Sequence, residues 1–306
     1  MTHIAYLTSC YPAPSHTFIR REIAGVRERG IEVSTFSVRR PAQGQRLTAI
    51  DEVERERTFY LVPSNAREVG AMLGAHLREL LAHPILYFRT LKLALRHRVP
   101  GFTAFVWSFF YFAEAILLAS ELKRRGITQL HNHFANPAAI VGMLASAYCG
   151  ATWSLTLHGI SEFDYPAGLL LKEKLRRADF AASASYFTMS QAMRHCDARD
   201  WPKLFICHCG IELSALPESR EQSHSSSGCR VVCVGRLSPE KGHLGLLQAV
   251  ATLRAEGMDV ELTLVGDGPE RERVVDKVAE LALSDHVTLL GQLDEATTLA
   301  TIREHD

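Results

Sequence analysis

The chain has 306 residues, with 34 Lys and Arg against 34 Asp and Glu, and an apolar fraction of 47%. This composition is typical of a globular protein of about two domains, and it excludes a disordered chain and a strongly basic protein that binds nucleic acid. Residues 1–127 hold 18 basic and 11 acidic residues, net +7, whereas the remainder holds 16 and 23, net −7. The N-terminal part is therefore suited to an anionic surface.

Short β-type runs alternate with helical patterns from the start of the chain. Residues 40–60 interrupt this order and are predicted to form a polar surface excursion. Alternation of strands and helices predicts a parallel α/β sheet. The expected strands of the first domain are 4–8, 31–38, 128–132, 152–157, 180–184 and 203–208.

The most apolar stretch is 102–119, which has one charge, Glu114, and seven aromatic residues. Its 18 residues reach the length of a membrane span. A buried helix is the preferred interpretation, because Glu114 lies inside the stretch and another α/β unit follows it. The alternative is a helix seated on a membrane surface, which the basic helical segment 66–98 favours.

A polar, Ser-rich segment divides the chain. Its composition predicts a linker at 216–228 between an N-terminal domain, 1–215, and a C-terminal domain, 229–306. Beyond the linker, short strands are each followed by a helix, which predicts a second doubly wound domain. These strands are expected at 231–234, 260–265 and 287–290.

The sharpest motif is Val234-Gly-Arg-Leu-Ser-Pro-Glu-Lys-Gly242, at the carboxyl end of a strand. Gly235 allows close approach of the backbone, Arg236 offers a planar donor fork, and Lys241 offers an ammonium group. Two cations beside a helix N-terminus predict a diphosphate site. The alternative is a capped turn with two solvated cations.

Taken with Leu264-Val-Gly-Asp-Gly-Pro269 one βα unit later, this motif resembles the donor-binding half of glycosyltransferase family 4. Three N-terminal motifs are similar to those of its exopolysaccharide and colanic-acid members. The resemblance covers essentially the whole chain, in the family order. These motifs are Ser15-His-Thr-Phe-Ile-Arg-Arg-Glu22, His131-Asn-His-Phe134 and Leu155-Thr-Leu-His-Gly159.

The resemblance implies the GT-B architecture of two Rossmann-like domains, and sugar transfer from a nucleotide diphosphate donor with retention and without a metal. Arg236 and Lys241, with Gly235, would then neutralise the donor diphosphate and stabilise the departing nucleotide. Gly266 and Gly268 would contact the base or ribose. A dinucleotide fingerprint is the weaker reading, since Arg271 occupies the third glycine position.

On the acceptor side, the resemblance implies that His158 lies at a cleft between the domains and shares a hydrogen bond with the reacting sugar, with Gly159 allowing close approach. The alternative for His158 is a residue that caps a strand end. Ser15 and Thr17 would face the donor in place of the Gly-rich turn of the family. Glu162 is either an acceptor contact or a solvated loop carboxylate.

Three histidine and cysteine patterns carry weaker predictions. His131 and His133 share a face of an extended segment, and His133 is a candidate for the acceptor side. Cys207-His-Cys209 is disfavoured as a metal site, because no second pair at zinc spacing follows. Cys229 and Cys233 are predicted to lie in the core, and no metal or cofactor is expected.

The resulting hypothesis is a retaining glycosyltransferase that uses a UDP- or GDP-sugar. Its acceptor would be a saccharide, expected to be lipid-linked, in cell-surface polysaccharide biosynthesis. The seven cysteines, an odd number, and an N-terminus unlike a signal peptide predict a cytoplasmic location, with contact to the inner membrane face as a further expectation.

The family's Glu-x7-Glu element would lie beyond residue 306, so a C-terminally truncated enzyme is expected. The alternative is an inactive remnant that keeps acceptor or membrane binding. A sugar-nucleotide epimerase and a nicotinamide dehydrogenase are less favoured.

Overall fold

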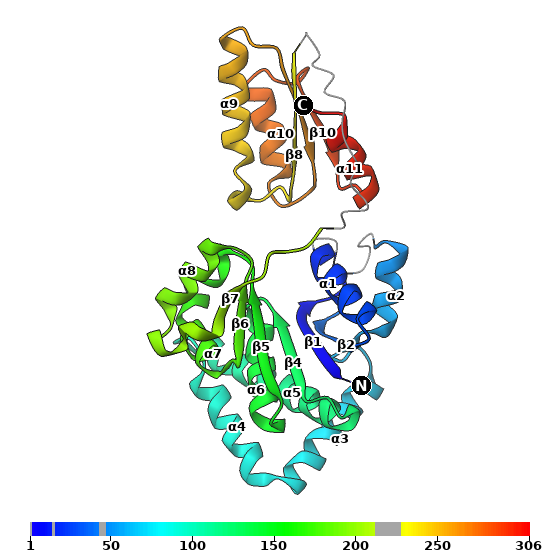
Figure 1. Cartoon of the computed structure of the whole chain (residues 1–306), viewed down its shortest axis with the longest axis vertical. Coiled ribbons are helices and arrows are strands. Elements are labelled where there is room, and N and C mark those ends of the chain that lie inside the picture. Colours follow the sequence, from blue (N-terminus) through cyan, green and yellow to red (C-terminus); the bar gives the residue numbers. More distant parts are fainter. Residues whose placement is uncertain (1, 14–15, 43–46, 212–227) are drawn as a thin grey trace. The chain divides into compact units, whose positions relative to one another are not determined.

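The computed structural model describes residues 2–13, 16–42, 47–211 and 228–306 (Figure 1). The chain divides into two compact units, Met1–Ile211 and Glu212–Asp306, which we call unit 1 and unit 2 and describe separately. The predicted linker 216–228 lies almost entirely outside the described residues.

Unit 1 is built on a seven-stranded parallel sheet with the order β3-β2-β1-β4-β5-β6-β7. The order changes direction at β1, which pairs with both β2 and β4. Ligands of open α/β sheets bind beside such a switch point, at the carboxyl ends of the strands. The strands are β1 His3–Cys10, β2 Glu32–Arg39, β3 Phe59–Tyr60, β4 Gln129–His133, β5 Thr152–Leu157, β6 Phe180–Ser183 and β7 Leu204–Ile206.

Eight α-helices and several short 3-10 turns of the described residues accompany this sheet. The core lies between the sheet and the helices α5 and α6, and the small and branched side chains of α6 are almost all buried. The helices are α1 Thr17–Glu28, α2 Ala49–Arg57, α3 Ala66–Ala82, α4 Pro84–Arg96, α5 Phe102–Arg125, α6 Pro137–Cys149, α7 Leu171–Arg177 and α8 Tyr186–His195.

The segment predicted as a polar excursion, 40–60, is more ordered than expected. It contains α2, which begins with a capping box between Thr48 and Asp51, and the edge strand β3. The prediction was wrong because α2 has few apolar residues and docks through charge. Glu54 is buried and receives hydrogen bonds from Tyr11 and Arg27.

Helix α5 contains the apolar stretch 102–119, and it is long and apolar enough to cross a membrane by length and composition alone. Its C-terminal half is buried in unit 1, and burial raises the pKa of Glu114 to about 7. Most of its N-terminal half is exposed. The predicted buried helix is therefore correct for only one half of α5.

Unit 2 contains a three-stranded parallel sheet with the order β10-β9-β8. Together the two sheets confirm the predicted α/β class. Cys229 is exposed and Cys233 is half-buried, so the predicted core position of Cys229 is wrong, because β8 lies at an edge of the described sheet. The elements are β8 Cys229–Val234, α9 His243–Ala255, β9 Val260–Val265, α10 Arg271–Glu280, β10 Val287–Gly291 and α11 Glu295–Arg303.

Candidate functional site

The carboxyl ends of β1, β4 and β5 gather aromatic and imidazole side chains around His158. His158 follows β5 directly, and its ring lies 4.7 Å from the ring of Phe18 in α1 and 4.7 Å from that of Phe134, which follows β4. His133 ends β4, and its Nδ1 lies 3.0 Å from His158 Nε2. The sheet order thus brings the three N-terminal motifs together at its switch point.

A chain of polar contacts runs through His158 to a carboxylate. Cys209 Sγ lies 3.6 Å from His158 Nδ1, and His133 Nε2 lies 3.6 Å from Glu22 Oε1. Tyr6 donates a hydrogen bond to the same Glu22 oxygen over 2.9 Å. The order along the chain is Cys209, His158, His133, Glu22 and Tyr6.

The pKa values indicate which groups carry protons in this series of contacts. Burial would raise the pKa of Glu22, but the neighbouring His133 and His131 lower it to about 2, so Glu22 is anionic. Burial lowers the pKa of His158 to about 3, and a positive charge on His133 would act in the same direction, so His158 is neutral. An anionic Glu22 favours the tautomer of His133 with its proton on Nε2. His158 then donates from Nε2 and keeps its Nδ1 lone pair for Cys209 or a ligand hydroxyl.

Glu162, in the 3-10 turn Ile160–Glu162, stabilises the backbone of this site through hydrogen bonds. Only 4% of it is exposed, and its carboxylate accepts the backbone N–H groups of Ala135, His158 and Gly159. Burial raises the pKa of Glu162, while these amides and the nearby Lys174 oppose the rise. The predicted solvated carboxylate is therefore wrong. Its oxygens accept three backbone amides, and its contact with an acceptor stays a prediction.

Lys174 of α7 completes this support. Its side chain is 2% exposed, and its ammonium donates to the carbonyl of Ala135. Burial lowers the pKa of Lys174 to about 8, and the charge of Glu162 opposes the fall. The sequence offered no indication of this residue, because its partners lie far from it along the chain.

His131 and His133 lie on one face of β4, with their ring centroids 5.0 Å apart. Donor atoms of Glu22, His131 and His133 lie within 4.8 Å of one another, a spacing that suits a metal ion. However, both ring nitrogens of His131 lie within hydrogen-bond distance of hydroxyls, those of Ser154 and Thr156. A metal would have to displace these contacts and that of His133 with His158.

The loop after β1 is described in part. Ser15 lies outside the described residues. Thr17 is half-buried and begins α1, and His16 Nδ1 lies 3.1 Å from the carbonyl oxygen of Cys10. Thr17 thus lies at the same edge of the sheet as His158.

In unit 2, the loop after β8 carries the two predicted cations. Arg236 is 63% exposed and forms an ion pair with Glu240, with Nη2 and Oε1 2.7 Å apart. Lys241 ends the 3-10 turn Pro239–Lys241, just before α9, and its side chain passes beside Gly235. A ligand diphosphate would compete with Glu240 for Arg236, whereas the ammonium group of Lys241 has no hydrogen-bond or ion-pair partner among the described residues.

Gly266 and Gly268 have a packing role in the structure. A Cβ atom at Gly266 would lie 1.9 Å from the carbonyl oxygen of Gly235, and one at Gly268 would lie 2.4 Å from that of Leu237. Leu237 also donates a backbone hydrogen bond to Asp267. These glycines therefore let the loops after β8 and β9 lie against each other. Their predicted contact with a base or ribose stays a prediction.

His243, the first residue of α9, is a candidate that the motif analysis missed. It is 1% exposed, and neither ring nitrogen has a hydrogen-bond partner within the described part of the chain. Burial lowers the pKa of His243, and the charge of Glu270 opposes the fall. A buried imidazole without a partner is costly unless a ligand or water satisfies it. Its position after Lys241 was the available clue.

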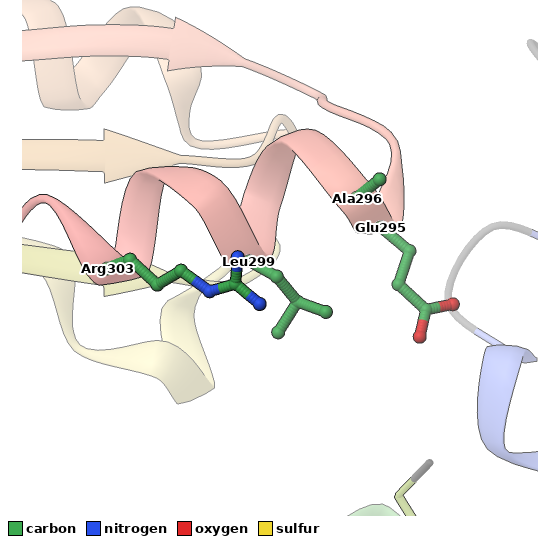
Figure 2. A pocket seen from close by; sticks show the side chains of 4 residues that line it. All are labelled: Glu295, Ala296, Leu299 and Arg303. Carbon is green, nitrogen blue, oxygen red and sulfur yellow. The ribbon is translucent and has the colours of Figure 1, made fainter. Parts of the chain in front are cut away.

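Elsewhere in unit 2, a hollow lies along α11, and Figure 2 shows Glu295, Ala296, Leu299 and Arg303 lining it. None of these four residues belongs to a motif that predicts a functional site.

Comparison with known proteins bears on unit 2 first. Residues 217–304 match the family model for glycosyl transferases group 1. This segment includes both loops that carry Arg236, Lys241, Gly266 and Gly268.

Two curated relatives extend the comparison. The chain is 23% identical over 232 residues to an N-acetyl-alpha-D-glucosaminyl L-malate synthase of Bacillus anthracis, which covers 72% of this chain and 59% of that protein. It is 33% identical over 101 residues to a phosphatidyl-myo-inositol mannosyltransferase of Mycolicibacterium smegmatis, covering 32% and 25%. The chain thus spans less than two thirds of the length of these relatives.

The fold resembles that of solved enzymes across its whole length. Sucrose-phosphate synthase of Thermosynechococcus elongatus matches with a TM-score of 0.64 at 17% identity, over 100% of this chain and 74% of that one. The chain has the GT-B fold, with two Rossmann-like units.

Proposed function

We propose that this chain acts as a retaining glycosyltransferase, which moves a sugar from a nucleotide diphosphate donor to a saccharide acceptor. The observation that carries the proposal is the loop after β8, which lies inside the segment matched to glycosyl transferases group 1. It presents Arg236 and Lys241 close in sequence to the buried His243, whose ring nitrogens lack a hydrogen-bond partner among the described residues. Cations at the carboxyl edge of a parallel sheet suit a diphosphate.

In this proposal, Arg236 exchanges its ion pair with Glu240 for the donor diphosphate, and Lys241 binds the same group. When the bond between the sugar and the phosphate breaks, the electron pair leaves on the phosphate oxygen. The two cations stabilise that charge, so no metal is needed for it. UDP and GDP remain equal candidates for the nucleotide.

His158 serves the sugar side of the reaction in this proposal. A neutral imidazole with a lone pair on Nδ1 accepts a hydrogen bond from a sugar hydroxyl and orients it. Glu162 and Lys174 position His158 through the backbone, and Glu22 and His133 set its tautomer. Orientation by a rigid frame is the usual requirement for such a group.

For the acceptor, we propose a lipid-linked saccharide at the cytoplasmic face of the membrane, in the assembly of a cell-surface polysaccharide. The motifs of unit 1, similar to those of exopolysaccharide enzymes, support this class. One relative is also named for a phosphatidyl-myo-inositol compound.

Calorimetry with UDP and GDP tests the donor site in the full chain. Arg236→Ala and Lys241→Ala should each weaken binding about tenfold to a hundredfold, because a hydrogen bond to a charged group contributes about 1.5–3 kcal/mol. Arg273→Ala is the matched control, since Arg273 is 69% exposed and pairs with Glu270 much as Arg236 pairs with Glu240. Equal affinity in all three variants would contradict the donor site.

Turnover separates the enzyme from its alternative. Hydrolysis or transfer of a UDP- or GDP-sugar by the purified chain supports the transferase. Binding of nucleotide without turnover, over a panel of sugars and acceptors, would favour the inactive remnant.

A further inference from the structure

Unit 1 exposes a large apolar surface on α3, α4 and the N-terminal half of α5, which we call the α3–α5 surface. Exposure reaches 73% at Leu81, 85% at Ile85 and 80% at Phe102. Monomeric soluble proteins rarely expose apolar side chains in such number within one region. The exposed members are Val69, Leu73, Leu77, Leu81, Ile85, Phe88, Phe102, Phe105, Val106, Trp107, Phe109 and Phe110.

On α5 the exposed side is broad and aromatic. Phe102, Phe105 and Phe109 are in ring contact along the helix, and Trp107 contacts Phe110. Only the opposite side, at residues such as Ser108 and Phe112, packs into the unit. The N-terminal half of α5 is therefore apolar on both sides and turns most of its aromatic side chains outward.

The charges around this surface are almost all positive. Arg78, Arg89, Lys92 and Arg96 are exposed, and none of them has an ion-pair partner among the described residues. The two carboxylates of the region are engaged elsewhere, Glu79 with Lys123 and Glu68 with Arg40. The surface thus combines aromatic side chains with uncompensated cations.

The three helices form one body, so the surface is present before any partner arrives. His76 of α3 lies within hydrogen-bond distance of the Tyr87 hydroxyl on α4 and of the Ala113 carbonyl on α5, at 2.8 Å and 3.1 Å. Figure 1 shows α3 and α4 as a hairpin at the end of unit 1 where β1 begins.

We propose that the α3–α5 surface docks unit 1 on an anionic lipid bilayer. Aromatic and aliphatic side chains enter the boundary between headgroups and acyl chains, and the four cations contact anionic headgroups. The helix lies in the interface and does not span, because the C-terminal half of α5 is part of the core. An apolar protein partner would not require a border of one charge sign, which favours lipid. The inference goes beyond the proposed transferase and rests on unit 1 alone.

Co-sedimentation of the full chain with vesicles tests this docking. We expect binding to vesicles of equal parts phosphatidylcholine and phosphatidylglycerol, and much weaker binding to phosphatidylcholine alone. High salt should weaken the binding to the mixed vesicles. Loss of each cation should cost about fivefold in affinity, since each contributes about 1 kcal/mol near an anionic surface.

Paired variants assign the binding to this surface. Phe109→Ser with Phe110→Ser should lower the affinity for mixed vesicles at least tenfold, and Arg89→Glu with Lys92→Glu should do so mainly at low salt. Phe187→Ser is the matched control, because Phe187 on α8 is 54% exposed and Phe110 is 53% exposed. Circular dichroism checks that each variant folds.

Three outcomes would overturn the proposal: no binding to either vesicle, binding that the paired variants do not change, or a dimer that the same variants dissociate. Size-exclusion chromatography with light scattering detects the dimer. Nucleotide affinity is measured on the same variants. If it is retained while vesicle binding is lost, the docking and the donor site are shown to be separate, and each can fail without the other.

Discussion

The loops at the carboxyl edges of the two sheets hold the same place in a parallel α/β unit, but they carry opposite chemistry. In unit 1, the edge is formed by half-buried neutral imidazoles between aromatic rings, with the anionic Glu22 behind them. In unit 2, the edge is formed by Arg236 and Lys241 in an open loop.

Because the two edges differ in charge, each suits a different kind of ligand. A neutral, rigid edge with directed hydrogen bonds suits uncharged hydroxyls, where geometry decides recognition. An exposed cationic edge suits a diphosphate, where charge dominates. A variant with a change at one edge can be compared with the unchanged edge of the other unit.

The largest effect is expected at Glu162, which supports the edge of unit 1. Glu162→Gln places a side-chain NH2 group where a carboxylate oxygen accepts backbone N–H groups, and it removes the charge near Lys174. We therefore expect a loss of about 3–5 kcal/mol in the free energy of unfolding. All three tryptophans lie in unit 1, so their fluorescence in a denaturant titration reports it. Glu173→Gln, on the exposed side of α7, should cost under about 1 kcal/mol. Equal losses would show that Glu162 is not a special support.

The next effect concerns the two packed loops of unit 2. Gly266 has φ +140, and an added Cβ would collide with the Gly235 carbonyl, so Gly266→Ala should destabilise unit 2 by about 2–4 kcal/mol. Hydrogen exchange of β8 and β9 measures this, with unit 1 as the internal reference. Gly245→Ala is the control, because open space surrounds Gly245 in α9, and we expect up to about 1 kcal/mol of stabilisation. Unchanged exchange in Gly266→Ala would refute the packing role.

The edge of unit 1 should also make stability depend on pH. Burial lowers the pKa of His131 and of His158 from 6.5 to about 3. Below pH 6.5 these histidines bind protons in the unfolded chain but not in the folded unit. Their contribution to the free energy of unfolding is therefore fully present above pH 6.5 and is lost as the pH falls toward 3. One such histidine costs about 2 kcal/mol between pH 6.5 and about pH 5.

His131→Asn should therefore reduce the slope of stability against pH in that window. Glu22 does not contribute there, because its pKa, lowered to about 2, acts below 4.5. Identical slopes in wild type and His131→Asn would contradict the neutral, buried imidazole.

The smallest effect is a change of tautomer. Nitrogen NMR of labelled histidine should show His158 with its proton on Nε2 in the wild type. Glu22→Gln removes the anion that orients His133, so a population with the proton on Nδ1 should grow. Glu28→Gln, on the exposed end of the same helix α1, should not alter the His158 resonances. If His158 of the wild type carries its proton on Nδ1, the inferred direction of the hydrogen bond between His133 and His158 is wrong.

Much of this organisation could be predicted because it is local in sequence. The strands follow from short β-branched runs, and the place of Arg236 and Lys241 follows from a strand that ends one residue before Gly235. The pairing of His133 with His158 needs one more fact, that β4 and β5 are neighbours with His133 beside Thr156. Alternation of strands and helices leaves that order open.

Other features could not be predicted, for physical reasons. Glu162 and Lys174 act through backbone groups of Ala135, which no side-chain pattern records. The exposed N-terminal half of α5 has no charged residue, whereas the buried C-terminal half carries five, so composition assigns burial to the wrong half. A glycine at 266 or 268 would stand in the sequence whether it makes room for a ligand or for a neighbouring loop, so the sequence does not separate the two roles.

The links between α3 and the rest of unit 1 have a mechanical consequence. Lys123 of α5 and Tyr148 of α6 both bind the buried carboxylate of Glu79, so α3 is tied to the core as well as to α4. A body held on a plane by such a stiff hairpin loses tilt in two directions and keeps only rotation about the normal. The proposed docking would thus fix the angle between the strands of unit 1 and the bilayer, and it would hold His158 at one constant height above the lipid.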